Sequence, residues 1–177
     1  MQIQIKKLTD TAIIPTKATD GAAGFDLYAD SFEEDPHIHA SQNVVVHTGV
    51  AMAIPKGYVG LIFARSGHAF KYGIRPVNCV GVIDSDYRGE IMVKLHQDLC
   101  LGDLYDPDTL HESPVAYYCA EDAVKSLYEN TIITEIEKGE RVAQIVFVKY
   151  NDEGFVEVDE LPDTNRGDGG FGSTGTK

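Results

Sequence analysis

Two short stretches of the chain place reactive side chains at turns. Asp84 follows the apolar run GVI at 81–83 and precedes the turn-forming sequence SDYRG, so its carboxylate is placed to orient a water molecule. Arg65, Ser66 and Gly67 follow another apolar segment, and a turn there can offer a cation, a hydroxyl and N–H groups to a phosphate. Each stretch also has a simpler interpretation: an aspartate that caps its own turn, and an ordinary surface turn with an arginine.

The C-terminal sequence RGDGGFGSTGTK, residues 166–177, combines many glycines with one arginine and one aromatic ring. Arg166 can bind a terminal phosphate, and Phe171 can stack on a planar base, a contact worth about 1–3 kcal/mol. Likenesses to a P-loop and to an RGD adhesion tripeptide are weak, because Lys177 comes one residue late for the first and the second requires export. We therefore expect a flexible arm that closes over a ligand carrying a base and phosphates.

Short strands are the elements that must position these residues. Runs rich in β-branched residues alternate with turn signals, which predicts an all-β sandwich or barrel. The stretch 77–91 is expected to form a β-hairpin with Asp84 at its corner. The expected strands lie within 1–10 (an edge strand), 43–54, 56–67, 90–95, 130–136, 141–150 and 155–161.

One irregular stretch, 97–130, interrupts the succession of strands. Its first half is rich in turn residues, and its second half places apolar side chains on one helical face after a start signal at Ser113 and Pro114. The sequence therefore predicts one short helix here, and a connection of this length is often functional. The residues on the expected helical face are Ala120, Val124, Leu127 and Tyr128.

The composition limits the classes of protein to consider. A chain of 177 residues fits one domain with a real core, and a net charge of −13 argues against binding to nucleic acid. Any phosphate site must then be locally cationic or be assisted by a divalent metal. No apolar run is long enough to span a membrane, and the N-terminal residues do not resemble a signal peptide, so we expect a cytoplasmic protein.

Other potential metal or redox residues have plainer explanations. Three widely spaced cysteines without a C-x-x-C pair argue against a zinc site or a disulfide scaffold, and we expect idle or buried thiols at Cys79, Cys100 and Cys119. The acidic residues at 103–112 lack the pattern of a calcium-binding loop, and His37 and His39 lack a third ligand. A solvated loop and an exposed strand edge are the favoured interpretations.

Five segments in order along the chain resemble the motifs of homotrimeric deoxyuridine triphosphate pyrophosphatases (dUTPases). One such motif would be weak, whereas five in order with compatible strands between them are highly specific. The segments are ATDGAAGFDLYA at 18–29, RSGHAFKYGI at 65–74, NCVGVIDSDYRGEI at 78–91, GERVAQIVF at 139–147 and RGDGGFGSTG at 166–175.

The resemblance implies a jelly-roll β-barrel subunit at 1–165 and a homotrimer whose active sites are shared between subunits. The arm at 166–177 would reach the site of a neighbouring subunit. The implied reaction converts dUTP and water to dUMP and pyrophosphate, which removes dUTP from the nucleotide pool and supplies a precursor of dTTP.

The resemblance also implies a role for each matching residue. Asp84 would orient the water that attacks the α-phosphorus in line, and Tyr87 would pack under the deoxyribose and reject a 2′-hydroxyl. Arg141 is interpreted as a structural ion-pair partner at the subunit contact. Uracil would be bound by Asn78 and by the backbone of the 78–84 segment, including Gly81, Val82 and Ile83. Phosphates and the closing arm would involve Arg65, Ser66, Gly67, Gln144, Arg166, Phe171, Gly172 and Ser173.

The implied cofactor is Mg²⁺, with Asp26 contacting it through a bound water. Magnesium typically keeps several waters and binds substrate phosphates, so it would let a chain of charge −13 hold a triphosphate.

Two features depart from the family pattern. His68 stands where an aliphatic residue is usual. The stretch 97–130 makes the connection between the third and fourth motifs about thirty residues longer than usual. We expect this insert to leave the chemistry intact. It either folds onto the subunit as a helix or contacts a protein partner, since aromatic residues are favoured at contacts.

Two other functions fit parts of the sequence. A dCTP deaminase shares the fold, but it would need a second serine and a glutamate where this chain has Gly67 and Lys94. A regulatory protein on a dUTPase scaffold could use the insert to bind its partner. Asp84, Tyr87 and Phe171 argue that catalysis is retained in that case.

Overall fold

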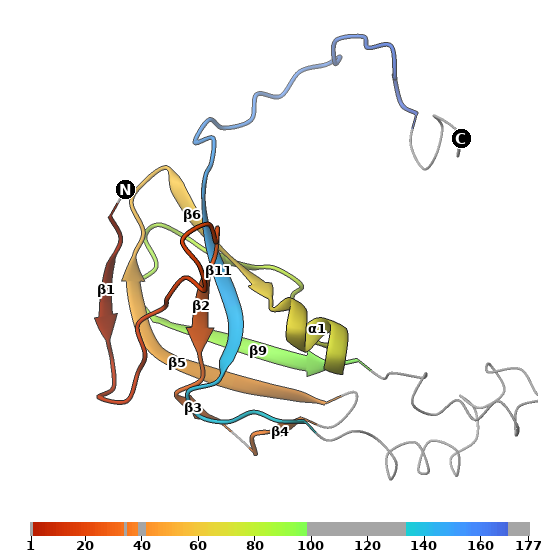
Figure 1. Cartoon of the computed structure of the whole chain (residues 1–177). Helices are drawn as coiled ribbons and strands as arrows, with labels where there is room; N and C mark the ends of the chain where they lie inside the picture. Colours follow the sequence, from red (N-terminus) through yellow and green to blue (C-terminus); the bar gives the residue numbers. More distant parts are fainter. Residues whose placement is uncertain (1, 34, 39–41, 99–133, 170–177) are drawn as a thin grey trace, which may run out of the picture.

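A computed structural model describes residues 2–33, 35–38, 42–98 and 134–169 of the chain. Within these residues, antiparallel strands form two main sheets with one short helix at their side (Figure 1). The all-β jelly-roll class predicted from the sequence is confirmed. No helix of the described part is long and apolar enough to cross a membrane.

The first sheet has the strand order β1–β5–β9–β7, and β3 also pairs with β5. Burial alternates along β9, where Ile91, Val93 and Leu95 face the core while Met92 and Lys94 are exposed. This is the period of a half-buried strand that the sequence predicted. The strands are β1 (Gln4–Lys7), β3 (Ser31–Phe32), β5 (Asn43–Ala53), β7 (Ile74–Pro76) and β9 (Glu90–Gln97).

The second sheet has the order β2–β11–β6–β8, and a small third sheet pairs β10 with β4. Apolar side chains from the sheets meet in one core that includes Leu27, Val46, Ile62, Ile91 and Ile145. The strands are β2 (Phe25–Tyr28), β4 (His37–Ile38), β6 (Tyr58–Ala64), β8 (Gly81–Ile83), β10 (Thr134–Glu135) and β11 (Arg141–Lys149).

The helix of the described part is α1 (Ser66–Tyr72), which begins directly after β6. It ends at Gly73, whose φ of 64° is the left-handed conformation that glycine adopts readily. The sequence predicted only a turn here, because seven residues with one buried side chain give little helical periodicity. The helix predicted near Ala120 lies outside the described residues.

Two local predictions were wrong. The expected hairpin at 77–91 does not form, because β8 pairs with β6 whereas β9 pairs with β5 and β7. The turn at 84–89 instead carries the chain from one sheet to the other. The expected strand at 155–161 is also absent: Phe155 and Leu161 are fully or largely exposed, and this segment runs away from the sheets (Figure 1). The segment 155–161 alternates like a strand, but it pairs with no strand within the described part of this chain.

A buried carboxylate, Asp30, ties the N-terminal segment to the sheets. Thr9 and Thr11 each donate a hydroxyl hydrogen bond to it, at 2.7 and 2.6 Å, and Lys138 Nζ lies 3.4 Å from its Oδ1. Burial alone would raise the pKa of Asp30, but these hydrogen bonds and the charge of Lys138 together hold it below its ordinary value. Gly49, at φ +65°, lies against this group, and a Cβ there would come within 2.9 Å of the Asp30 and Thr9 oxygens.

Candidate active site

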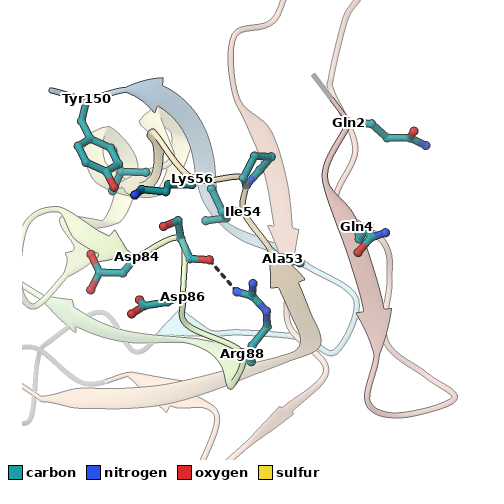
Figure 2. A pocket seen from close by; sticks show the side chains of 12 residues that line it. Gln2, Gln4, Ala53, Ile54, Lys56, Asp84, Asp86, Arg88 and Tyr150 are labelled. Atoms are coloured by element: carbon teal, nitrogen blue, oxygen red, sulfur yellow. Dashed lines mark hydrogen bonds between the residues drawn. The ribbon is translucent and has the colours of Figure 1, made fainter. Parts of the chain in front are cut away.

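Asp84 follows the last residue of β8 and lines an open cavity of about 1170 Å³ (Figure 2). Its backbone carbonyl accepts the Tyr87 N–H at 3.2 Å, which closes the turn. No donor among the described residues hydrogen-bonds its side-chain carboxylate, so the interpretation of Asp84 as a side-chain cap is wrong. The carboxylate is exposed in the cavity and is free to bind a water molecule.

Charged groups of both signs surround Asp84 in this cavity. Asp86 lies on the same side of the turn, and Lys56 and Arg88 supply cations (Figure 2). Arg88 Nη1 donates to the backbone carbonyls of Ser85 and Tyr87, at 2.7 and 2.8 Å. Arg88 therefore braces the turn that presents Asp84, a role that sequence reasoning missed because the DYRG segment looked like an ordinary turn.

Tyr87 lies on the same turn but does not line the cavity. Its hydroxyl donates to the Glu90 carbonyl at 3.0 Å, and its ring crosses over Gly89. A Cβ at Gly89 would overlap the Tyr87 ring and hydroxyl, so any larger residue there would force the phenol out of this position. The Glu90 carboxylate accepts from the Gly49 N–H at 2.8 Å and from His47 Nδ1 at 2.9 Å, and the second bond raises the pKa of His47.

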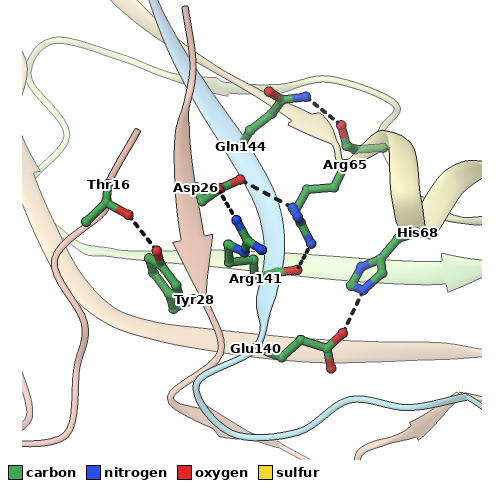
Figure 3. A network of polar contacts seen from close by, with 9 residues as sticks. Thr16, Asp26, Tyr28, Arg65, His68, Glu140, Arg141 and Gln144 are labelled. Atoms are coloured by element: carbon green, nitrogen blue, oxygen red, sulfur yellow. Dashed lines mark hydrogen bonds and ion pairs between the residues drawn. The ribbon is translucent and has the colours of Figure 1, made fainter. Parts of the chain in front are cut away.

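A second group of predicted residues gathers where β6 meets α1. Both oxygens of Asp26 face guanidinium groups: Arg65 Nε is 3.3 Å from Oδ1, and Arg141 Nη1 is 3.3 Å from Oδ2 (Figure 3). Arg65 Nη1 also donates to the Arg141 carbonyl at 2.9 Å. The ion pair predicted for Arg141 therefore forms within one chain, with Asp26.

Gln144, Ser66 and Gly67 complete this second group. Gln144 lies opposite Asp26 in the pairing of β11 with β2, and its Nε2 donates to the Ala64 carbonyl at 3.0 Å. Ser66 and Gly67 are exposed, and within the described chain the Ser66 hydroxyl has no hydrogen-bond partner. A Cβ at Gly67 would meet nothing within 4 Å, so packing inside the chain does not require glycine there.

The two groups lie at opposite ends of β6. Ile83 pairs with Gly60, which places Asp84 beside Val59 at the start of that strand, whereas Arg65 follows its last residue. Six positions separate Val59 from Arg65, and at about 3.3 Å per residue this is about 20 Å. The register of β6 with β8 therefore keeps Asp84 and Arg65 well apart within one chain.

The remaining predicted site residues are on the 78–83 segment and on the arm. Asn78 is exposed, its side-chain amide has no partner in the described part, and Gly81 to Ile83 form β8. Arg166 is exposed, and its Nε donates to the Gly169 carbonyl at 2.8 Å. Phe171, Gly172 and Ser173 lie outside the described residues.

His68 is the buried side chain of α1, which sequence reasoning noted only as a departure from the usual aliphatic residue. Its Nε2 is 2.8 Å from Glu140 Oε1, so the ring donates to a carboxylate at the residue just before β11 (Figure 3). One indication of the contact between His68 and Glu140 was present in the sequence: a polar residue stands where the family usually has an aliphatic one.

Comparison with known proteins gives the family of the chain. The family model described as dUTPase matches residues 10–98 and 125–175. This chain belongs to the dUTPase family. All the predicted site residues fall in the matched parts, and the unmatched residues 99–124 lie within the predicted insert at 97–130.

Relatives of similar length support the assignment. A deoxyuridine 5′-triphosphate nucleotidohydrolase of Nautilia profundicola is 41% identical over 175 residues, covering 99% of both chains. One of a Hydrogenobaculum species is 38% identical over 177 residues, covering all of both chains. A solved structure of the Staphylococcus bacteriophage 80alpha dUTPase with dUPNHPP has a TM-score of 0.71 at 26% identity, covering 98% of both chains. Curated dUTPases of the same length as this chain therefore exist.

Proposed function

We propose that this chain is a dUTP diphosphatase, which hydrolyses dUTP to dUMP and pyrophosphate. The observation that supports dUTP as the substrate is the family match, which spans both groups of site residues and the arm as far as residue 175. In the cell this reaction would remove dUTP from the nucleotide pool and supply dUMP for dTTP synthesis.

Asp84 is the proposed catalytic residue. Its exposed carboxylate, without a protein donor, would accept a proton from a water and orient that water toward the α-phosphorus. The oxygen between the α- and β-phosphorus would leave in line with the attack, as part of pyrophosphate. Arg88 supports this role because it donates hydrogen bonds to two backbone carbonyls of the turn and so holds the turn in place. Positioning supplies much of the rate in such a displacement.

Arg65, Ser66, Gly67 and Gln144 are proposed to bind the phosphates. The Ser66 hydroxyl is unpartnered in the described chain, and Gly67 has open space in front of it, so an anion can approach the backbone closely. Arg65 is held in place by Asp26 and by the Arg141 carbonyl. Arg166, Phe171, Gly172 and Ser173 would close over the bound nucleotide, with the arginine on phosphate and the ring on uracil.

Asn78 and the backbone of Gly81, Val82 and Ile83 are proposed to bind the uracil edge. A site with unpartnered polar groups selects strongly for a base that satisfies them. Tyr87 would pack against the deoxyribose and exclude a 2′-hydroxyl. Its ring is already fixed by the bond from its hydroxyl to the Glu90 carbonyl and by the close fit over Gly89.

Mg²⁺ is the proposed cofactor, and the donor set fits an ion carried mainly by the substrate. No group of three or more His, Cys, Asp or Glu side chains that could hold a metal occurs in the described part of the chain. Arg65 and Arg141 already approach both Asp26 oxygens, which suits contact through a metal-bound water better than direct coordination. Bound with the triphosphate, the ion would neutralise phosphate charge.

A homotrimer with shared active sites is proposed for the assembly. The separation of Asp84 from Arg65 along β6 supports it, because in a shared site the two groups that act on one substrate would come from different subunits. The exposed apolar side chains of Phe155, Val156 and Leu161 support it as well, since they lack partners in the described chain. Mass measurement in solution tests this proposal: a monomer that turns over dUTP would contradict it.

The test of the proposed function is a pyrophosphate-release assay with Mg²⁺ and four substrates, dUTP, dTTP, dCTP and UTP. We expect turnover of dUTP and at most slow turnover of the other three. Absence of dUTP turnover would contradict the proposal. Ammonia release from dCTP would indicate a deaminase instead, although Gly67 and Lys94 stand at the positions where that enzyme needs serine and glutamate.

Binding of a regulatory protein partner through the insert is a second candidate function. The family model leaves 99–124 unmatched, and the bacteriophage 80alpha dUTPases are described as controlling transfer of virulence genes. Replacement of 100–131 by a short linker tests the idea and keeps Asp98, which pairs with Arg75 through two contacts of 2.9 Å. Unchanged activity, assembly and protein-capture profile in this variant would contradict it.

A further inference from the structure

His68 is the only side chain of α1 that is buried, although the helix also contains Phe70 and Tyr72. A helix of seven residues is not stable by itself, so contacts with the sheets must hold it. Phe70 is 91% exposed and Tyr72 is 37% exposed, whereas His68 is 5% exposed. The contact that anchors this helix is therefore made through a polar ring.

The His68 ring reaches the segment that leads into β11. Because a carboxylate only accepts hydrogen bonds, Nε2 is the donor in the 2.8 Å contact with Glu140 Oε1. The other oxygen of Glu140 accepts the Glu137 N–H at 3.1 Å, and the Glu140 carbonyl accepts the Ala29 N–H at 2.8 Å. Hydrogen bonds from Glu137 and from Ala29, the residue after β2, thus hold Glu140 in place independently of His68.

Two tethers consequently join the start of α1 to the start of β11. One is the hydrogen bond from Arg65 Nη1 to the Arg141 carbonyl, and the other is the bond from His68 to Glu140. Ser66 and Gly67 lie between the two attachment points, Arg65 and His68, and are exposed, and the Ser66 hydroxyl has no hydrogen bond in the described chain. The orientation of these two residues depends on the tethers on each side.

We propose that His68 is a positioning residue for the phosphates of the substrate, acting through Glu140 to fix the Arg65–Ser66–Gly67 turn against β11. This inference rests on the proposed function, because it takes that turn as the phosphate-binding part of the site. His68 itself does not touch substrate. Its partner Glu140 directly precedes Arg141 in the chain, and Arg141 forms an ion pair with Asp26.

The polar character of the pair argues for positioning rather than for stability alone. Nδ1 of His68 is buried and has no hydrogen-bond partner among the described residues. A leucine would fill such a site without leaving a polar atom unpaired, and buried polar pairs are often no more stabilising than well-packed apolar groups. What an aliphatic side chain would lack is the directional link to Glu140.

Ligand binding to four proteins tests the proposal: wild type, His68→Leu, His68→Gln and Glu140→Ala. The probes are the α,β-imido analogue of dUTP, which carries all three phosphates, and dUMP, which lacks the outer two. We expect His68→Leu and Glu140→Ala to bind the analogue about tenfold more weakly, with dUMP affinity unchanged within about twofold. His68→Gln should recover most of the loss, because its amide can donate to Glu140. A fifth protein, the double variant His68→Leu with Glu140→Ala, should lose no more than either single variant.

Several outcomes would overturn the proposal. Equal losses for the analogue and dUMP would indicate a general structural role, and so would a His68→Leu protein that does not fold. Wild-type affinity in both His68→Leu and Glu140→Ala would show that the link positions nothing. Failure of the proposed function is separate, since in that case wild-type protein would bind neither probe and would not turn over dUTP.

Discussion

The Tyr87 hydroxyl donates a hydrogen bond to the Glu90 backbone carbonyl, 3.0 Å away, across a glycine that leaves room for the ring. Glu90 is held in turn through its side chain by His47 and by the Gly49 N–H. The position of the phenol proposed to lie against the sugar is therefore set by its neighbours in the chain and not by the ligand.

Substitution Gly89→Ala should weaken the discrimination between dUTP and UTP. The new Cβ overlaps the Tyr87 ring, so the ring must move, at a cost of about 1–3 kcal/mol. We expect kcat/KM for dUTP to fall about tenfold and that for UTP to fall less, measured by pyrophosphate release. Gly154→Ala is the matched control, because a Cβ there meets nothing within 4 Å. An unchanged dUTP/UTP ratio in Gly89→Ala would contradict the assigned role of Tyr87.

Substitution Asp30→Asn should destabilise the fold by about 1–3 kcal/mol near neutral pH, because it removes a buried charge that two hydroxyls and Lys138 satisfy. Against the effect of burial, the hydrogen bonds from Thr11 and Thr9 and the charge of Lys138 hold the folded-state pKa of Asp30 below its ordinary value, so the ionised form stabilises the fold above the pKa of the unfolded chain. The contribution is lost as pH falls through the folded-state pKa.

Urea denaturation from pH 7 to pH 3, at one protein concentration, measures this effect. The difference in unfolding free energy between wild type and Asp30→Asn should narrow toward the acid end. The exposed Asp152, whose one ion pair among the described residues is with Lys56 at 3.4 Å, supplies the control Asp152→Asn, which should differ little from wild type. A difference for Asp30→Asn that stays constant across the range would contradict the low pKa of this group.

The strands and the order of the motifs followed from the sequence, because both are local properties. Alternation of apolar and polar residues predicted β9, and the apolar run before Asp84 predicted β8. The pairing of β8 was not predicted correctly, since alternation does not say which sheet a strand joins. The segment 155–161 has the alternation of a strand, but its partner is not supplied by the described chain.

The sequence supplied the residues proposed for the site, but it did not predict how they are arranged. The motifs identified Asp84 and Arg65, yet only the register of β6 with β8 places them at opposite ends of a strand. The helix at Ser66 was missed because its anchor is the polar His68, which gives no apolar periodicity. The contact of His68 with Glu140 joins residues 72 positions apart, which no local pattern reveals.

Truncation after Asn165 should leave a folded assembly that binds dUTP and hydrolyses it poorly. The hydrogen bonds of the described start of the arm are local: Arg166 bonds to Gly169, and the Gly167 N–H bonds to Thr164, which the truncation retains. Within the described residues the sheets therefore lose no hydrogen bond. We expect kcat to fall by about 10²-fold or more, because closure aligns the substrate and excludes water. Circular dichroism and rapid-quench kinetics check the fold and the rate. A truncated protein with wild-type kcat would contradict the role of the arm.

The central claim is that Asp84 prepares the water that attacks dUTP, and comparison of Asp84→Asn with Asp86→Asn tests it most directly. Both side chains lie on one turn and line one cavity, and each substitution removes one negative charge there. A difference between the two variants therefore reports the catalytic role of Asp84 and not the loss of charge. With saturating dUTP and Mg²⁺, pyrophosphate release by Asp84→Asn should be about 10²–10⁴-fold slower than by wild type, while Asp86→Asn stays within about tenfold. Near-normal turnover by Asp84→Asn would contradict the account.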